Sequence, residues 1–254
     1  MITKKKLLLL IVVPFWLGLF FGCQNFNKVS NVSSSNPVNQ PNNTTVKIET
    51  PATSTPTPPP LKKTPQPKKI DKAQLVDIQT VNPNILLDIR YATENNFMKK
   101  PVYSVARCVL RGEVAEKLSQ VQQDLEKQGL GLKVYDCYRP LSVQKLMWQV
   151  REARPYVANP ARGSKHNRGA AVDITLVDRN GQELEMPTEF DNFTRRASIT
   201  YAGASTEAKK NRALLGSAMK RRGFIPLSKE WWHFDAIGWQ KYKILDVPLD
   251  AVPR

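Results

Sequence analysis

Residues 164–177, which read SKHNRGAAVDITLV, contain the clearest strand signal of the chain. Apolar side chains recur at every second position from Ala170 to Val177, and a period of two is typical of a β-strand. One face of this strand would carry four apolar side chains, Ala170, Val172, Ile174 and Leu176. Asp173 would project from the opposite, polar face, and His166 precedes the strand in a glycine-containing turn. The stretch therefore predicts a sheet strand that holds a carboxylate close to a histidine.

Other segments predict further strands and helices around this one. Helices are predicted over residues 112–128 and 140–154, where apolar residues recur every three to four positions, and over residues 206–222. Pro140 suits the first turn of the second helix, and Ser205 and Gly223 would open and close the third. Strands are predicted over residues 85–91, 132–138 and 231–237. Because strands and helices alternate irregularly, we expect one α+β domain over residues 70–254, with helices packed on a mainly antiparallel sheet.

The first 23 residues have the pattern of a secretory signal. Three lysines, at positions 4–6, precede an apolar run from Leu7 to Gly22. Cys23 stands where a bacterial lipoprotein signal places its lipidated cysteine, so residues 1–23 are predicted to be a signal and lipoprotein segment. An uncleaved apolar anchor is the alternative, although the run is short for a membrane span. Either interpretation places the rest of the chain outside the cytoplasm, in the periplasm or at the cell surface, and anchored to a membrane.

Residues 24–69 are rich in Asn, Ser, Thr and Pro. Such a segment cannot bury enough apolar surface to offset its ordering entropy, so we predict a disordered tether. The formal net charge of the chain is +16, and residues 1–70, with nine lysines and one glutamate, carry half of it. The domain is therefore only mildly basic. This argues against nucleic-acid binding and suits an anionic cell-surface polymer or a membrane surface.

The predicted domain holds two cysteines, Cys108 and Cys137. Outside the cytoplasm they can form a disulfide. They can equally remain two separate buried thiols, because spacing in the sequence does not show proximity. They lie in separate segments without a CxxC motif, so they make a poor zinc site.

The chain contains only two histidines, His166 and His233. A catalytic zinc site uses three His, Asp or Glu ligands and leaves a fourth position for water. His166, Asp173 and His233 are therefore predicted to bind one Zn²⁺ per chain. Glu230 is the candidate base that takes a proton from the activated water. On a regular strand Glu230 and His233 would point to opposite faces, so we expect Glu230 in the loop before the strand or at a bulge.

Each of these residues also fits a structural role when it is considered alone. A histidine near a glycine is usually an ordinary loop residue, and Glu-Trp-Trp-His at 230–233 also fits an aromatic core strand. Asp173 also fits a capped or paired structural carboxylate. Because both histidines of the chain occur together with these carboxylates, we favour the metal site.

The same residues resemble a known family. Ser-x-His-x-x-Gly-x-Ala-x-Asp at 164–173, followed by Glu-x-x-His at 230–233, resembles the zinc D,D-peptidases, peptidase family M15. Further stretches resemble its D-alanyl-D-alanine dipeptidase branch, which includes vancomycin-resistance dipeptidases: DIRYATENNF at 88–97, DCYRP at 136–140 and MPTEFD at 186–191. The resemblance covers residues 76–242 and implies the hedgehog/D,D-peptidase type of fold.

The resemblance also implies roles for residues outside the metal ligands. Glu230 is similar to the general base that later protonates the leaving amine. Arg139 is expected to stabilise the oxyanion of the tetrahedral intermediate, and Asp136 to orient it. A surface ion pair for Arg139 and a structural carboxylate for Asp136 are the alternatives.

The substrate of this branch is a dipeptide with both ends charged. Asp191 is expected to bind its amino group and Ser164 its carboxylate. Trp231 and Trp232 are expected to form walls of a closed pocket. Two tyrosines are expected either to line the pocket or to pack in the core, Tyr91 and Tyr138.

Hydrolysis of D-alanyl-D-alanine to two D-alanines is the function that the resemblance implies. One alternative is a D,D-carboxypeptidase that trims the terminal D-alanine from peptidoglycan stem peptides. A second is a non-catalytic, zinc-stabilised cell-wall-binding module, in which Glu230 would be dispensable. A purely structural lipoprotein would leave both histidines unexplained. Another divalent ion also suits imidazole and carboxylate ligands.

Overall fold

The computed structural model describes residues 71–254, and its main sheet has five strands in the order β2-β4-β5-β7-β6. In that order the strands span Leu86–Leu87, Gly131–Asp136, Ala171–Val177, His233–Ala236 and Phe224–Pro226. β2 and β4 run parallel, and the other neighbouring pairs run antiparallel. A two-stranded antiparallel sheet pairs β1, Leu75–Asp77, with β3, Val109–Arg111. The prediction of an α+β fold with a mainly antiparallel sheet is confirmed.

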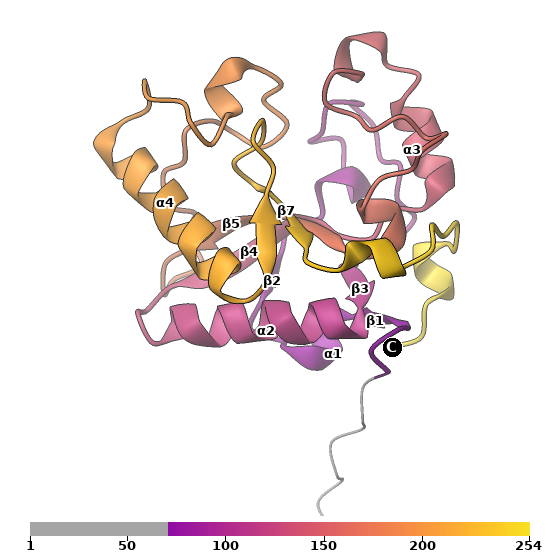
Figure 1. The fold of residues 1–254 in the computed structure, drawn as a ribbon, viewed down its shortest axis with the longest axis horizontal. Coiled ribbons are helices and arrows are strands. Elements are labelled where there is room, and N and C mark those ends of the chain that lie inside the picture. Colours follow the sequence, from indigo (N-terminus) through magenta and orange to yellow (C-terminus); the bar gives the residue numbers. More distant parts are fainter. Residues whose placement is uncertain (1–70) are drawn as a thin grey trace, which may run out of the picture. The chain divides into compact units, whose positions relative to one another are not determined.

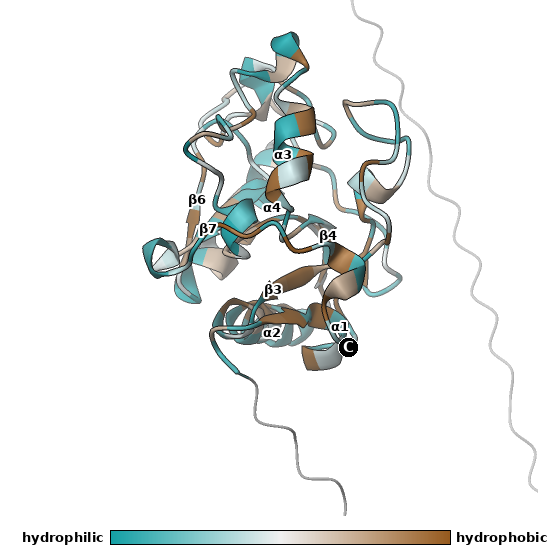
Figure 2. Ribbon diagram, turned by 90° about the vertical axis from the view of Figure 1, so that its right-hand side faces the viewer, coloured by the Kyte–Doolittle hydropathy of each residue, from teal (hydrophilic) through white to brown (hydrophobic). Residues whose placement is uncertain are grey.

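The described chain contains four α-helices, which span Ile78–Val81 (α1), Gly112–Glu126 (α2), Leu141–Met147 (α3) and Thr206–Arg221 (α4). α2 runs along one side of the main sheet and contacts β4 and α4, while α4 contacts β5 and β6 (Figure 1). The predicted apolar stripe of α2 is buried, and in Figure 2 this helix carries both hydrophobic and hydrophilic residues whereas β3 is hydrophobic. α2 and α4 therefore pack against the main sheet, while α3 lies apart from them.

Six short 3₁₀ helices complete the described structure. They span Arg90–Ala92 (η1), Arg151–Ala153 (η2), His166–Arg168 (η3), Arg195–Ala197 (η4), Trp239–Lys241 (η5) and Leu249–Ala251 (η6). In residues 71–254 we find no helix that is both long and apolar enough to cross a membrane. The predicted signal segment 1–23, with Cys23, and the predicted tether 24–69 lie outside the described residues.

Three predicted elements are shorter than expected. The helix predicted over 140–154 ends at Met147, because Val150 is extended and the Trp148 carbonyl accepts from the Arg154 side chain. The strand predicted over 85–91 ends at Leu87, because the chain turns into η1. The strand predicted over 231–237 begins at His233, because Trp231 donates its backbone N–H to Ala197 outside the sheet.

β5 is buried on both faces. The apolar side chains predicted to share one face, Ala170 just before the strand and Val172, Ile174 and Leu176 within it, are each fully buried. Asp173 and Thr175, on the polar face, are also buried, at 3% and 1% exposure. The polar face of the central strand therefore points into the protein, where a buried carboxylate needs charged or hydrogen-bonding partners.

Cys108 and Cys137 form a disulfide, with 5.2 Å between their Cα atoms. The bond connects the residue before β3 to the residue after β4. It resolves the alternative that the sequence left open, in favour of pairing. It also joins the two-stranded sheet to the end of β4 in the main sheet.

Candidate active site

Three elements bring His166, Asp173 and His233 together. Asp173 lies within β5 and His233 is the first residue of β7, and the antiparallel register places the two directly opposite each other. His166 begins η3, immediately before β5. This turn closes at Gly169, whose φ of 67° is left-handed, and a Cβ there would lie 2.7 Å from the Leu75 side chain. The left-handed backbone thus favours glycine where the chain enters the sheet after His166.

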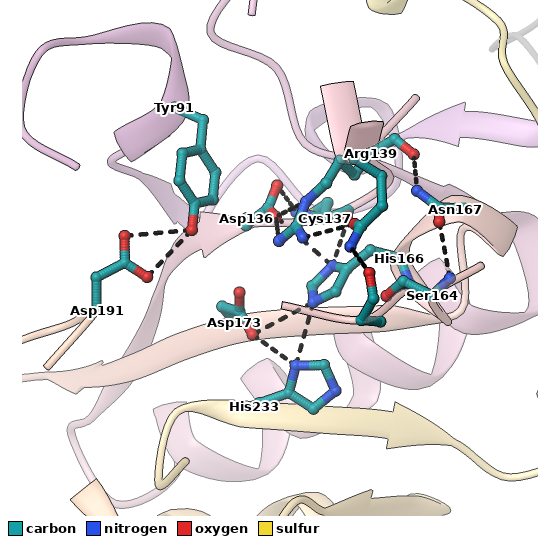
Figure 3. Close-up of polar contacts among 12 residues, drawn as sticks. Tyr91, Asp136, Cys137, Arg139, Ser164, His166, Asn167, Asp173, Asp191 and His233 are labelled. Carbon is teal, nitrogen blue, oxygen red and sulfur yellow. Dashed lines mark hydrogen bonds and ion pairs between the residues drawn. The ribbon is translucent and has the colours of Figure 1, made fainter. Parts of the chain in front are cut away.

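Side-chain atoms of these three residues face one common point (Figure 3). His233 Nδ1 lies 2.9 Å from Asp173 Oδ1 and 3.1 Å from His166 Nε2. His166 Nε2 lies 3.5 Å from Asp173 Oδ1. Ligand atoms in a tetrahedral zinc site lie about 3.3 Å from one another, so this spacing fits the ion. Within residues 71–254, this is the one group of three His, Cys, Asp or Glu side chains that is close enough to hold a metal.

A hydrogen bond on the far side of each ring fixes which nitrogen faces this point. The Nδ1–H of His166 donates to the carbonyl oxygen of Cys137 at 2.6 Å, because a carbonyl can only accept. The Nε2–H of His233 donates to Oδ1 of Asp235 at 2.9 Å. In neutral rings, the two inner nitrogens, Nε2 of His166 and Nδ1 of His233, then carry lone pairs that face each other and Asp173. Three electron-rich atoms this close repel one another unless a cation lies between them, so the donor set fits a bound metal.

The charges around His233 favour a positive charge at this point. Burial lowers the pKa of His233, but its hydrogen bonds to Asp173 and Asp235 outweigh this and raise the pKa to about 10. Burial raises the pKa of Asp173, yet His166 and His233 hold it well below its usual range. The carboxylates therefore stabilise either a proton on the imidazole or a metal cation in its place.

Glu230 lies in the turn before β7, as strand parity required. Its N–H donates to the Leu227 carbonyl at 3.3 Å, and its own carbonyl accepts from the His233 N–H at 3.3 Å. The carboxylate is buried, with Oε2 3.9 Å from His233 Nδ1. Burial raises the pKa of Glu230 to about 7, so this side chain can accept and return a proton near neutral pH.

Arg139 is buried beside the histidines and is held by two side chains. Its Nη2 and Nε donate to Oδ2 of Asp136 at 2.6 and 3.1 Å, and its Nη1 donates to Oε1 of Gln144 at 2.9 Å. Asp136 Oδ1 accepts from the Tyr103 hydroxyl at 2.6 Å and from the Cys137 N–H at 2.8 Å. Burial lowers the pKa of Arg139, but Asp136 and the nearby groups raise it well above its usual value. The guanidinium is therefore charged, and its direction is fixed.

Asp191 and Ser164 lie on opposite sides of the metal-ligand group (Figure 3). Asp191 has a positive φ of 58°, which is uncommon for a residue with a side chain. Its carboxylate accepts from the Tyr91 hydroxyl at 3.1 Å, while burial, followed by the charge of Asp173, raises its pKa to about 7. Ser164 Oγ accepts from the His166 N–H at 3.2 Å, so it also caps the turn that carries the histidine.

A cavity of about 290 Å³ connects the metal-ligand group with Glu230, Arg139, Asp191 and Ser164. Six aromatic side chains also line it: Tyr91, Phe97, Tyr156, Phe193, Trp232 and Trp239. Tyr156 and Phe193 stack with their ring centroids 4.8 Å apart, and Phe97 lies 5.2 Å from Phe193. These three rings come from three separate loops, so the walls of the cavity are assembled by the tertiary fold.

Trp231 does not line the cavity, contrary to expectation, and the two tyrosines divide between the two alternatives left open for them, since Tyr138 packs in the core. Trp232 and Tyr91 line the cavity, as expected. Trp231 instead donates its Nε1–H to the Thr188 hydroxyl at 2.9 Å. Tyr138 donates its hydroxyl to the backbone carbonyl of residue 247, and thereby fixes the C-terminal segment. Adjacent residues in the turn before β7 point in different directions, which the sequence pattern did not show.

Sequence analysis missed two residues that hold the site together, Asp235 and Gln144. Asp235 lies two residues after His233 on β7, so the period-two pattern of a strand would have placed it near the same ring. Gln144 contacts Arg139 from within α3, and its own amide donates to the Ala158 carbonyl at 2.7 Å. A glutamine within a predicted helix carries no comparable signal.

Two imidazoles and a carboxylate around one point, with a second buried carboxylate and a charged arginine beside them, define a single-metal hydrolase of the α+β class. Residues 71–248 match the family model of peptidase M15, described as D-ala-D-ala dipeptidase. The chain belongs to this family of metallopeptidases.

Individual relatives agree with the family match. The chain is 34% identical to the D-alanyl-D-alanine dipeptidase of Escherichia coli (strain K12) over 175 residues, which is 69% of this chain and 91% of the relative. It is 33% identical to the D-alanyl-D-alanine dipeptidase of Enterococcus faecium, over 58% of this chain and 83% of the relative. Among solved structures, the LdcB LD-carboxypeptidase aligns at a TM-score of 0.36 with 24% identity, over 52% of this chain and 61% of its own.

Proposed function

We propose that this protein hydrolyses D-alanyl-D-alanine to two D-alanines, with one Zn²⁺ per chain held by His166, Asp173 and His233. The observation that carries the proposal is the pair of fixed imidazoles, whose inner nitrogens meet Asp173 beside the buried Glu230. The relatives that are D-alanyl-D-alanine dipeptidases support the choice of substrate. When bound, zinc supplies a Lewis acid that polarises the scissile carbonyl and acidifies water.

Glu230 moves the proton in this proposal. Its carboxylate takes a proton from the attacking water and returns it to the amine of the leaving D-alanine. Burial raises the pKa of Glu230 above that of an ordinary carboxyl, which makes its carboxylate a stronger base for the first step. Arg139 stabilises the negative charge that develops on the carbonyl oxygen. Since Asp136 and Gln144 already hold the guanidinium, little reorganisation is needed when this charge appears.

The shape and charges of the cavity suit a small substrate with both ends charged. Its volume of about 290 Å³ lies at the low end of ligand pockets, which typically have about 300–1,000 Å³. Asp191 binds the ammonium group of the dipeptide, and Ser164 binds its carboxylate. A longer peptide has no free ammonium group at this position, so it would leave the buried Asp191 without a counter-charge.

The test is release of free D-alanine by the purified full-length protein. D-alanyl-D-alanine and a stem pentapeptide that ends in D-Ala-D-Ala are assayed in parallel, with and without a chelator. Glu230→Gln is compared with Glu94→Gln, an exposed matched control. We expect fast release from the dipeptide, loss of activity with chelator, and a fall of about 100–10,000-fold in kcat for Glu230→Gln alone, with zinc retained.

The other outcomes select between the alternatives. Release mainly from the pentapeptide would make this protein a carboxypeptidase and would remove Asp191 from its proposed role. Zinc binding without release from either substrate, and with Glu230→Gln indistinguishable from wild type, would favour a binding module.

We also propose that the domain acts outside the cytoplasm, anchored through Cys23. The signal pattern of residues 1–23 and the composition of residues 24–69 support this location. Incorporation of labelled palmitate that is lost in Cys23→Ser would support lipidation. Wild-type protein that remains unlabelled, or that fractionates with the cytoplasm, would refute it.

A further inference from the structure

We propose that the Cys108–Cys137 disulfide is a positioning element of the metal centre, which holds the ring of His166 in its ligating orientation. The inference rests on the proposed zinc site and adds a requirement to it. Zinc affinity should depend on the Cys108–Cys137 disulfide, although neither sulfur is a zinc ligand.

The backbone of Cys137 contacts both parts of the active site. Its carbonyl oxygen accepts from Nδ1–H of His166 at 2.6 Å, which sets the tautomer and direction of that ring. Its N–H donates to Asp136 at 2.8 Å, and Asp136 holds Arg139. A shift of the backbone at Cys137 would therefore move a metal ligand and the arginine together.

Regular sheet pairing does not extend to Cys137. β4 ends at Asp136, and its register with β5 is already irregular between Val134 and Asp136. What anchors Cys137 laterally is the disulfide to Cys108, together with the next residue, whose N–H donates to the Val109 carbonyl at 2.9 Å. Both cysteines are buried, at 0% and 1% exposure. The disulfide thus helps to fix the Cys137 backbone at the point where the strand pairing of β4 stops.

Cys108 itself belongs to a different part of the fold. It precedes β3, and its carbonyl accepts from the Ile78 N–H at 2.9 Å, at the start of α1. Its side chain reaches the metal centre through the sulfur–sulfur bond, while the neighbouring Val109 keeps its own backbone hydrogen bond with Tyr138. A substitution at Cys108 therefore separates the effect of the bond from any direct effect of changing Cys137.

The experiment measures zinc dissociation constants by chelator competition on the full-length protein. Wild type is compared with Cys108→Ala, Cys137→Ala and the double variant, and melting temperatures are recorded for each. We expect each variant to bind zinc about 10–100-fold more weakly than wild type. We also expect the double variant to match the single variants, because all three remove the same bond.

Leu118→Ala is the control for a general loss of stability, because Leu118 is buried on α2 beside the opposite face of the sheet. It should lower the melting temperature and leave the zinc dissociation constant unchanged. If Cys108→Ala does not fold, wild type reduced with a phosphine reductant replaces it in the same comparison.

Cys108→Ala, or reduced wild type, with the zinc affinity of the oxidised protein would overturn the inference and leave the proposed function intact. A wild-type protein that binds no zinc would overturn the proposed function itself. A loss of affinity in Leu118→Ala equal to that in Cys108→Ala would show that the disulfide acts through stability alone, and this too would overturn the inference.

Discussion

His166 lies in a tight turn, and its ring donates to the backbone carbonyl of Cys137. His233 lies on a strand, and its ring donates to the carboxylate of Asp235. The Cys137 carbonyl is neutral, and the chain geometry around it sets its position. Asp235 is charged, and its Oδ2 lies 3.4 Å from Nζ of the partly exposed Lys165. One side of the metal centre thus relies on geometry and the other on charge to present a nitrogen lone pair. The two sides should therefore respond to different perturbations.

Removal of either ring should have the largest effect, and the effect should be the same on both sides. His166→Ala and His233→Ala each leave two protein ligands where a catalytic zinc site needs three. We expect zinc affinity to fall by more than about 100-fold in each and D-alanine release to fall to background. Metal content after dialysis and the dipeptide assay measure this. Full zinc retention in one variant would show that its ring is not a ligand, and the two histidines could then not be compared as two sides of one metal centre.

Asp235 should show how far charge controls the His233 side. Asp235→Asn keeps an acceptor oxygen and removes the charge, whereas Asp235→Ala removes both. We expect zinc to bind about 10-fold more weakly in the first and about 100-fold more weakly in the second, by chelator competition. The exposed Asp250, changed to Asn, is the matched control. Wild-type affinity in Asp235→Asn would mean that the acceptor oxygen is sufficient and that its charge is not required.

Gly169 should show how far geometry controls the His166 side. Gly169→Ala places a side chain at a left-handed φ and against Leu75, so we expect a loss of at least about 1–2 kcal/mol in the free energy of unfolding. Gly216→Ala is the control, because its new methyl group meets open space in the middle of α4. That variant should gain about 0.5–1 kcal/mol. Urea unfolding measures both, and equal effects at the two sites would contradict the assigned role of the turn.

The smallest effect should come from Glu113, which ties α2 to the segment after β7. Side-chain hydrogen bonds from Lys117 and then Lys241 hold the pKa of Glu113 at about 2, below its usual 4.5. A depressed pKa stabilises the fold above pH 4.5, and this contribution is lost as the pH falls toward 2. Because the pair is partly exposed, Glu113→Gln should cost about 0.5–1 kcal/mol at pH 7. Denaturant unfolding at pH 7 and pH 2 tests this, and a difference that persists at pH 2 would show another cause.

Local signals account for the elements that the sequence predicted well. The alternation in residues 170–177 predicted β5, the periodicity of residues 112–128 predicted α2, and the end signals Ser205 and Gly223 predicted α4, each with ends within two residues. The position of Glu230 before β7 also followed from local parity. What failed was the length of segments whose ends depend on tertiary contacts, such as the chain after Met147.

The metal ligands of the candidate site could be predicted from the sequence, but the groups that hold these side chains in position could not. The types and spacing of His166, Asp173 and His233 are visible in the sequence. The register that sets Asp173 opposite His233 is a property of the folded sheet. The partner of the His166 ring is a backbone carbonyl, which any residue type supplies, so no sequence pattern marks it. The burial of the polar face of β5 likewise depends on loops that are distant in the chain.

β7 joins β5 through three paired residues, and one of these pairs is Asp173 with His233. In the main sheet, β6 pairs with β7, at the edge away from β4. An ion bound by both Asp173 and His233 would therefore stabilise the attachment of β7, and with it β6, to β5 and the rest of the sheet. Amide hydrogens of β6 and β7 should then exchange with solvent more slowly when metal is present, while those of α2 keep their rates.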